Sequence, residues 1–216
     1  MIDIRGDVVT IDAMGCQAAI ARQIRKKEAH YVLAVKENQK NLYEGTRDYF
    51  EYLEQGRCPD KPADRWESPL EKDHGRIERR SVTTATDLAW MDGKKEWEDL
   101  TTIIRYRTSR TIGENTAVTD RYYISSLNAS AEMFAGRIRG HWSIENNLHW
   151  SLDVLFREDA CQVRKDRAPE NPNILRKIAL AGLRATPVAK KNFSTGRKSF
   201  KAAINPHFLL DALFGK

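Results

Sequence analysis

The sequence Val8-Val9-Thr10-Ile11-Asp12-Ala13-Met14-Gly15, near the start of the chain, is the strongest indication of its architecture. Its β-branched first half predicts a short strand, and the Asp-Ala-Met-Gly sequence that follows predicts a break. Residues 17–29 have apolar positions at helical spacing and predict a helix. The run from His30 to Val35 is almost wholly apolar and predicts a second strand. Strand, helix and strand in this order indicate a parallel α/β unit with both strands buried.

Asp12 directly follows the first of these strands. Open α/β sheets place their chemistry in the loops after the carboxyl ends of strands, so Asp12 is a candidate functional residue. Aspartates after strands also make turn or cap hydrogen bonds, and for Asp12 alone that interpretation stays open.

The rest of the chain divides by pattern into β and helical parts. Residues 38–55 predict a helix, and residues 56–70, with three prolines, predict a connector. Strands are expected at residues 77–86, 100–107 and 118–127. Helical spacing returns over residues 130–157, with Ser130 as the cap, and again over residues 173–185. The tail is basic and loosely patterned until residues 208–214.

These patterns give four segments along the chain. We expect a strand–helix–strand core at residues 1–37, a mostly β insertion at residues 38–127, a helical remainder of the core at residues 128–186 and a basic C-terminal tail at residues 187–216.

Composition narrows the class of protein. The 216 residues carry a formal net charge of +6, and no apolar run is long enough to span a bilayer. The N-terminus lacks the organisation of a secretory signal, so we expect a cytoplasmic protein. Cys16, Cys58 and Cys161 fit neither a disulfide framework nor a zinc pattern, which indicates reduced thiols. Residues 162–216 hold 12 Lys and Arg against 3 Asp and Glu, a balance that suits a polyanion such as nucleic acid or a solvated surface.

One carboxylate interrupts the apolar stripe of the long predicted helix. The stripe has the spacing 4, 3, 4, 3, 4 and consists of Ile138, Trp142, Glu145, His149, Leu152 and Phe156. A buried carboxylate costs several kcal/mol unless it is paired or binds a metal, so Glu145 could be a metal ligand or a partner of a histidine. It could also lie in water at the edge of the stripe. We expect Trp142 and Trp150 to be core residues.

Two metals fit these residue types to different degrees. The His141–Glu145–His149 spacing allows a zinc site, although it differs from the zinc-protease pattern. Asp12 and Glu145 together offer hard oxygen ligands on regular elements, which suit Mg²⁺ or Mn²⁺. Such ions catalyse phosphodiester cleavage in two-metal sites.

Long stretches of the chain resemble one family. The sequence from Val8 to Gln17 and the sequence His141-Trp142-Ser143-Ile144-Glu145-Asn146-Asn147-Leu148-His149-Trp150-Ser151-Leu152-Asp153-Val154 are similar to DDE transposases of the ISAs type. This insertion-sequence family includes the H-repeat-associated, Rhs-linked proteins. Three shorter matches are His74-Gly75-Arg76-Ile77-Glu78-Arg79-Arg80, Tyr122-Tyr123-Ile124-Ser125-Ser126-Leu127 and Phe156-Arg157-Glu158-Asp159. The resemblance covers essentially the whole chain.

The resemblance implies an α/β fold with a ribonuclease-H-like core, a mostly β insertion and a long catalytic helix. It also implies a triad of two aspartates and one glutamate, in which Asp12 would be the second aspartate and Glu145 the glutamate. Both would hold Mg²⁺ or Mn²⁺. The reaction would be cleavage and transfer of DNA strands, with insertion-sequence ends and target DNA as partners.

The first aspartate of the triad is the point of departure from the family. The family carries it upstream in an Asp-Gly-Lys segment on the first core strand. Here Asp3 and Asp7 lack that context, and Met1 stands eleven residues before Asp12. We therefore expect a partial core without its first strands, in a truncated transposase that is inactive alone. An N-terminal fragment supplied in trans, or a homo-oligomer, is a possible partner. The alternative is a non-catalytic DNA-binding remnant of a transposase, or a chain without a stable fold.

Basic residues in two regions are candidates for contacts with DNA phosphates. They could equally be ordinary solvated charges. The candidates are Arg76, Arg79, Arg80, Arg164, Lys165, Arg167, Lys190 and Lys191.

Overall fold

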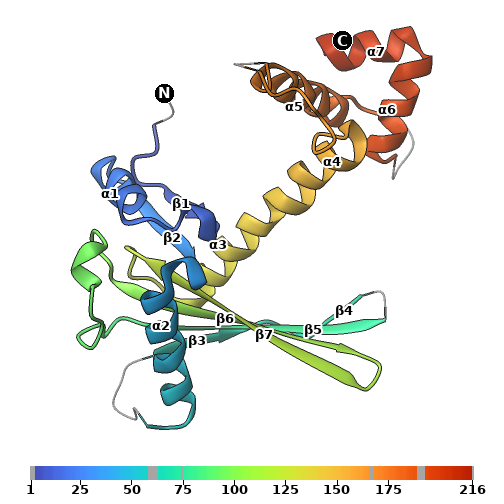
Figure 1. Cartoon of the computed structure of the whole chain (residues 1–216). Helices are drawn as coiled ribbons and strands as arrows, with labels where there is room; N and C mark the ends of the chain where they lie inside the picture. Colours follow the sequence, from blue (N-terminus) through green and yellow to red (C-terminus); the bar gives the residue numbers. More distant parts are fainter. Residues whose placement is uncertain (1–2, 58–62, 74, 166–167, 189–192, 216) are drawn as a thin grey trace. The chain divides into compact units, whose positions relative to one another are not determined.

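The computed structural model describes residues 3–57, 63–73, 75–165, 168–188 and 193–215, without the side chains of Asp73, Glu145 and Asn146. The chain divides into unit 1, Met1–His141, and unit 2, Trp142–Lys216 (Figure 1). Unit 1 contains a mixed sheet with helices, and unit 2 is helical. Among the described residues, no helix is both long and apolar enough to cross a membrane.

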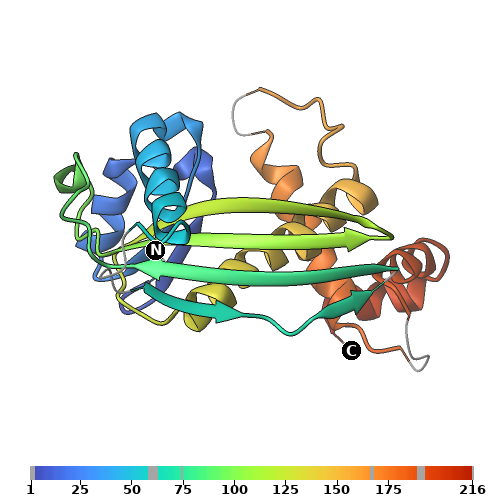
Figure 2. The same cartoon turned by 90° about the horizontal axis from the view of Figure 1, so that it is seen from below.

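One seven-stranded sheet organises unit 1 (Figure 2). Its strands follow the order β1-β2-β7-β6-β5-β3. The short strand β4 also pairs with β5, along a different part of β5 from β3. The bounds are β1 Val8–Ile11, β2 His30–Val35, β3 Ala63–Glu67, β4 Glu71–Asp73, β5 Arg76–Ala85, β6 Thr102–Ile112 and β7 Asn115–Ser125. Only β1 and β2 are parallel among these pairs, and the others are antiparallel.

The predicted parallel unit is present. β1 and β2 pair in register from Val8 opposite His30 to Ile11 opposite Leu33, and helix α1 (Ala18–Lys26) connects them. Strand β2 is buried, as expected, because β1 and β7 flank it on its two sides. The expectation that β1 is equally buried is wrong. β1 stands at the end of the sheet with one neighbour, and its four residues are half-buried.

The strands expected in a separate insertion belong to the same sheet as β1 and β2. β7 pairs with β2 in antiparallel register, from Val32 opposite Ser125 to Val35 opposite Tyr122. The expected connector at residues 56–70 also contains a strand, β3, which pairs with β5. Pro69 follows β3 without entering it, and an edge strand tolerates such a neighbour. The sheet therefore continues without interruption from β1 to β3.

Helices form at all the predicted places and also in the tail. The bounds are α2 Lys40–Glu54, α3 Ala131–Ile144, α4 Trp150–Phe156, α5 Glu170–Ala185, α6 Thr195–Ile204 and α7 Pro206–Phe214. Short turns are η1 Ala13–Gly15, η2 Glu37–Gln39 and η3 Lys94–Glu96, and η4, Glu145–His149, is a π-helix. The hydroxyl of Ser130 accepts a hydrogen bond from the Met133 amide, which confirms the expected cap of α3.

The expectation that the tail is loosely patterned before residue 208 is wrong, because α6 forms there, and both α6 and α7 are capped from within the sequence. Ser194 accepts a hydrogen bond from the amide of Arg197, and Asn205 accepts one from the amide of Phe208. Pro206 occupies the first turn of α7, where its missing amide costs nothing.

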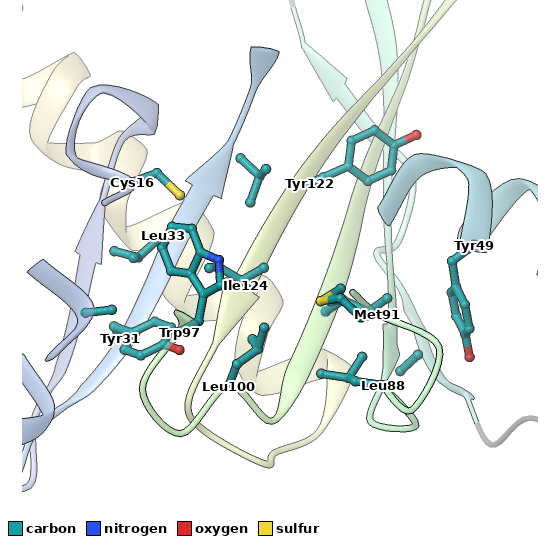
Figure 3. Close-up of a cluster of buried hydrophobic side chains, with 14 of the residues drawn as sticks. Cys16, Tyr31, Leu33, Tyr49, Leu88, Met91, Trp97, Leu100, Tyr122 and Ile124 are labelled. Atoms are coloured by element: carbon teal, nitrogen blue, oxygen red, sulfur yellow. The ribbon is translucent and has the colours of Figure 1, made fainter. Parts of the chain in front are cut away.

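The core of unit 1 packs on β2 and β7 (Figure 3). Tyr31, Leu33 and Ile124 meet Trp97 and Leu100, which come from the segment between β5 and β6. The Tyr31 hydroxyl donates to the Glu98 carbonyl at 3.0 Å, so its polar end is satisfied.

The free cysteines among the described residues differ in their surroundings. Burial raises the pKa of the Cys16 thiol to about 12, whereas a hydrogen bond from Arg176 lowers the pKa of Cys161. Cys58 lies outside the described residues.

Helices α2 and α3 lie on opposite faces of the sheet. Phe50 of α2 stacks on Tyr122 of β7, with ring centroids 6.3 Å apart. Arg139 of α3 binds Glu71 of β4, and Glu71 is paired across the strands with Glu78. The row of paired residues that contains Tyr122 lies an odd number of positions along the sheet from the row that contains Glu71 and Glu78. Because side chains alternate between the two faces along a strand, Tyr122 points to one face, and Glu71 and Glu78 point to the other.

A chain of ion pairs fastens α3 to β4 and β5. Arg80 contacts Glu78 at 2.6 Å and Glu71 at 2.8 Å, and Arg139 contacts Glu71 at 2.6 Å. Hydrogen bonds from Arg139 and Arg80 lower the pKa of Glu71 to about 2 from the ordinary 4.5. The ionised form of Glu71 is therefore favoured in the folded state.

Acid titration tests this network. Because the folded pKa of Glu71 lies below the unfolded one, its contribution to stability is complete above pH 4.5 and is lost as the pH falls toward 2. Glu71→Gln is expected to remove about 1 kcal/mol or less at pH 7, since the pair is partly exposed, and only a small part of that at pH 2. Urea unfolding at both pH values measures the difference. An equal loss at pH 7 and pH 2 would contradict the ion-pair explanation.

Candidate active site

Asp12 lies in unit 1 at the carboxyl end of β1, directly before η1. Its backbone is extended, and its carbonyl accepts a hydrogen bond from the Gly15 amide at 2.9 Å. The side chain is 55% exposed and makes no cap hydrogen bond to η1. Asp12 stands at the N-cap of η1, but its carboxylate oxygens accept no hydrogen bond from the amides of that turn.

Lys36 is the charged neighbour of Asp12. It follows β2, and its Nζ lies 3.8 Å from Oδ1 of Asp12. Parallel strands bring their carboxyl ends to the same edge of the sheet, so the residues after β1 and after β2 meet. Lys36 was not predicted as a site residue, although its place directly after the second strand was a usable signal.

Side chains that follow β2 hold the loop that carries Asp12. Asn38 donates to the Ala13 carbonyl at 2.8 Å, and Gln39 donates to the Cys16 carbonyl at 2.9 Å. Gly15 lies so close to β1 that a Cβ at this position would overlap the side chain of Ile11. Both observations indicate a loop with one fixed conformation.

A hydrogen bond links β1 to the last residue of unit 1. Oγ1 of Thr10 lies 3.1 Å from Nδ1 of His141, which belongs to the final turn of α3. Thr10 precedes Asp12 by two residues in the sequence, and His141 precedes Glu145 by four.

Glu145 opens the π-helix η4 at the start of unit 2. The Glu145 side chain lies outside the described part of the structure, so its three interpretations stay open. A π-turn holds more residues than an α-turn, and the predicted stripe of one continuous helix is therefore interrupted. Ile138 and Leu152 are buried, as the stripe predicts, but His149 is exposed.

The two tryptophans on either side of η4 differ in burial. Trp142 is half-buried, but the prediction that Trp150 is a core residue is wrong, since its side chain is 59% exposed. Partial burial and the carboxylates of Asp159 and Glu158 raise the pKa of Asp153 on α4.

The described residues contain no group of three or more His, Cys, Asp or Glu side chains placed to hold a metal ion. Asp12 itself offers an accessible carboxylate, the ligand type that a hard cation prefers, and a cation bound there would displace the ammonium of Lys36. Its chemistry suits Mg²⁺ or Mn²⁺ better than zinc, which prefers nitrogen and sulfur.

The candidate DNA-binding residues differ in their exposure and in whether carboxylates already pair with them. Arg76 lies 4.0 Å from Glu78 and Arg79 lies 3.4 Å from Glu67, and both arginines are accessible. Arg80 is engaged by two glutamates and is mostly buried. In unit 2, Arg164 donates to the Cys161 and Val163 carbonyls, and Lys165 is exposed. Arg167, Lys190 and Lys191 lie outside the described residues.

Comparison with known proteins gives a consistent result. Residues 1–181 match a family model described as "Transposase DDE domain". The chain is 37% identical over its full length to "Putative protein YbfL" and 36% identical to "H repeat-associated putative transposase YhhI", both of Escherichia coli K12. It is 35% identical over 99% of its length to "Putative transposase YncI" of Escherichia coli O157:H7.

The chain spans only part of these relatives. The alignments cover 57% of the first two proteins and 54% of the third. No solved structure matches the chain.

Replacement of Gly15 tests the fixed conformation of the Asp12 loop. Gly15→Ala places a Cβ against Ile11, so the loop or the strand must shift, and we expect a loss of about 1–3 kcal/mol. Gly136→Ala is the matched control, because Gly136 lies within α3 with open space around it and alanine favours helices. Thermal unfolding should show a lower Tm for the first variant and an unchanged or higher Tm for the second. A neutral Gly15→Ala would mean that the loop is adaptable.

Proposed function

Because the chain belongs to the family of the transposase DDE domain, we propose that it acts in the transposition of a mobile DNA element, with Asp12 and Glu145 as catalytic carboxylates. The reaction would be metal-dependent cleavage of DNA strands followed by strand transfer. The accessible carboxylate of Asp12 at the end of a parallel strand is the observation that carries the proposal.

Three features around Asp12 support its role. The carboxylate is accessible and makes no cap hydrogen bond to the turn that follows it. The loop after Asp12 is held by Asn38 and Gln39, so the backbone next to the carboxylate is fixed before any ligand binds. Lys36 provides a compensating positive charge at 3.8 Å.

The proposed role of Glu145 is supported by its sequence context and by its backbone. Glu145 lies in the longest stretch that resembles the family, and it begins a π-helical turn. Such turns are rare and are frequent at functional sites. The hydrogen bond between Thr10 and His141 ties the end of α3 to the strand that precedes Asp12.

The carboxylates of Asp12 and Glu145 would hold Mg²⁺ or Mn²⁺, whose bound form supplies a water nucleophile and stabilises charge on phosphate oxygens. The protein's part is to fix the positions of the ligand oxygens. Lys36, which lies beside Asp12, would balance its charge and orient it. Little reorganisation of the Asp12 loop is then needed when substrate binds.

DNA is the proposed partner. Arg76 and Arg79 on β5, and Arg164 and Lys165 in unit 2, are accessible cations that suit phosphate contacts. Arg80 contributes less to this proposal, since Glu71 and Glu78 already hold its guanidinium. The remaining basic candidates, Arg167, Lys190 and Lys191, belong to the proposal on sequence alone.

The triad that the family resemblance implies has one carboxylate more than Asp12 and Glu145 supply. We propose that the active assembly obtains it from a further segment of the kind present in the longer relatives. The assay therefore uses the chain alone and the chain mixed with the part of a relative that lies outside the alignment.

Nicking of supercoiled plasmid DNA tests the catalytic assignment. With Mg²⁺ or Mn²⁺ present, Asp12→Asn and Glu145→Gln are each expected to lower the nicking rate by about 10²-fold or more, the scale for removal of one preorganised electrostatic group. DNA affinity at a fixed salt concentration should stay unchanged. Glu114→Gln in the exposed β6–β7 turn is the matched control and should nick at the normal rate.

The outcomes separate the two functional classes. Metal-dependent nicking that both substitutions abolish supports the transposase reaction. Salt-sensitive DNA binding without nicking, either alone or in the mixture, would replace it with the non-catalytic DNA-binding function.

A further inference from the structure

Unit 2 has a hollow of about 710 Å³ between η4, α4, α5 and the start of α6. Its polar lining consists of Asn147, Trp150, Ser151, Arg184, Ser194 and Thr195. No aspartate or glutamate among the described residues lines it, so the only formal charge in its described wall is that of Arg184. A hollow with these walls favours an anionic ligand.

Arg184 is held in place with part of its guanidinium unused. Its Nη2 donates to the Asn147 carbonyl and to Oγ of Ser151, the latter at 3.1 Å. Both bonds use the same nitrogen, and the other N–H groups of Arg184 have no acceptor among the described residues. A planar guanidinium with a free edge suits the oxygens of a phosphate.

Trp150 supplies an aromatic surface in the same hollow. Its side chain is 59% exposed, and a tryptophan that is not needed for the core offers its ring to a ligand. Base–aromatic stacking is a major term in the binding of single-stranded nucleic acids. Ser194 and Thr195 add hydroxyl groups that can bind phosphate or sugar oxygens.

A second hollow, in unit 1, shows the opposite arrangement. It has a volume of about 420 Å³ and contains Arg105 and Arg107, but Glu54 binds them at 2.9 Å and 2.6 Å. Asp120 also binds Arg107 at 2.7 Å. These arginines are neutralised by their neighbours, so they serve the packing of α2 on the sheet. Arg184 has no such carboxylate among the described residues.

We propose that the hollow of unit 2 binds one nucleotide of a DNA strand, with the phosphate on Arg184 and the base against Trp150. Asn147 follows Glu145 by two residues within η4, so Arg184 also braces the turn that carries the proposed catalytic glutamate. A strand bound here would lie next to that turn. The inference rests on the proposed function in one respect, namely that DNA is the substrate.

Binding of an eight-nucleotide oligothymidylate tests the proposal without metal or cleavage. The oligonucleotide should quench tryptophan fluorescence, and Trp150→Phe should remove most of that quenching. Arg184→Gln should weaken binding by about tenfold, the low end of what one base–aromatic or phosphate contact provides. It should also lower the slope of log affinity against log salt by about 0.7, the value for one contact with a single strand.

Two further variants guard against a change in fold. Arg197→Gln removes the same charge from α6 outside the lining and should bind normally. Thr195→Glu keeps Arg184 and its bonds but adds a negative charge at the mouth of the hollow, and Thr195→Gln is its neutral control. Binding should fall about tenfold with glutamate and little with glutamine, while circular dichroism stays unchanged.

The proposal is overturned if Trp150→Phe retains the quenching. It is also overturned if Arg184→Gln weakens binding no more than Arg197→Gln, or if Thr195→Glu binds as well as Thr195→Gln. Plasmid nicking that depends on Asp12 and Glu145 without oligonucleotide binding to the hollow would reject this site alone. Oligonucleotide binding without nicking would reject the catalytic proposal and retain the nucleotide site.

Discussion

The burial of β2 is the constraint on which unit 1 depends. Residues Tyr31–Val35 are all buried, and the strand has a parallel neighbour on one side and an antiparallel one on the other. The start of β2 is secured by hydroxyl groups, because Ser125 donates to the Tyr31 carbonyl at 2.7 Å and Ser126 accepts from the Tyr31 amide at 3.2 Å. This parallel pairing brings the end of β1 and the end of β2 to one edge. Asp12 and Lys36 meet there as a consequence of backbone pairing rather than of their own attraction.

The local sequence pattern was sufficient to predict those strands and helices that depend on neighbouring residues alone. The run of apolar residues in β2, the break at Asp12 and the helical spacing before Ile144 all predicted what the structure contains. Local pattern failed where partners are distant in sequence. Nothing near β7 indicates that it lies beside β2, and the half-burial of β1 follows from a missing neighbour rather than from its own residues. Helix α6 was missed although Ser194 is an ordinary cap residue, and of α7 only the change of pattern at residues 208–214 was noted.

The candidate site divides in the same way. Asp12 could be found because it directly follows a predicted strand of a parallel unit, where α/β sheets place functional residues. Its support by Asn38 and Gln39 could not, since those contacts depend on where the residues after β2 lie. The spacing of apolar residues does not predict the π-turn at Glu145, because the same apolar residues would be expected in a continuous α-helix. Trp150 was misassigned for the same reason, and its exposure became visible only with the arrangement of α4, α5 and α6.

The half-buried β1 strand has a consequence for the behaviour of the chain in solution. No other strand among the described residues pairs with its outer edge, and an open edge is a template for a strand of another molecule. The strand is only four residues long, so such a pairing gains few backbone hydrogen bonds. Short edge strands are one of the devices by which proteins avoid growth into fibrils. Self-association through β1 should therefore be weak and reversible. Its extent should follow protein concentration and should not grow steadily with time, as fibril formation does.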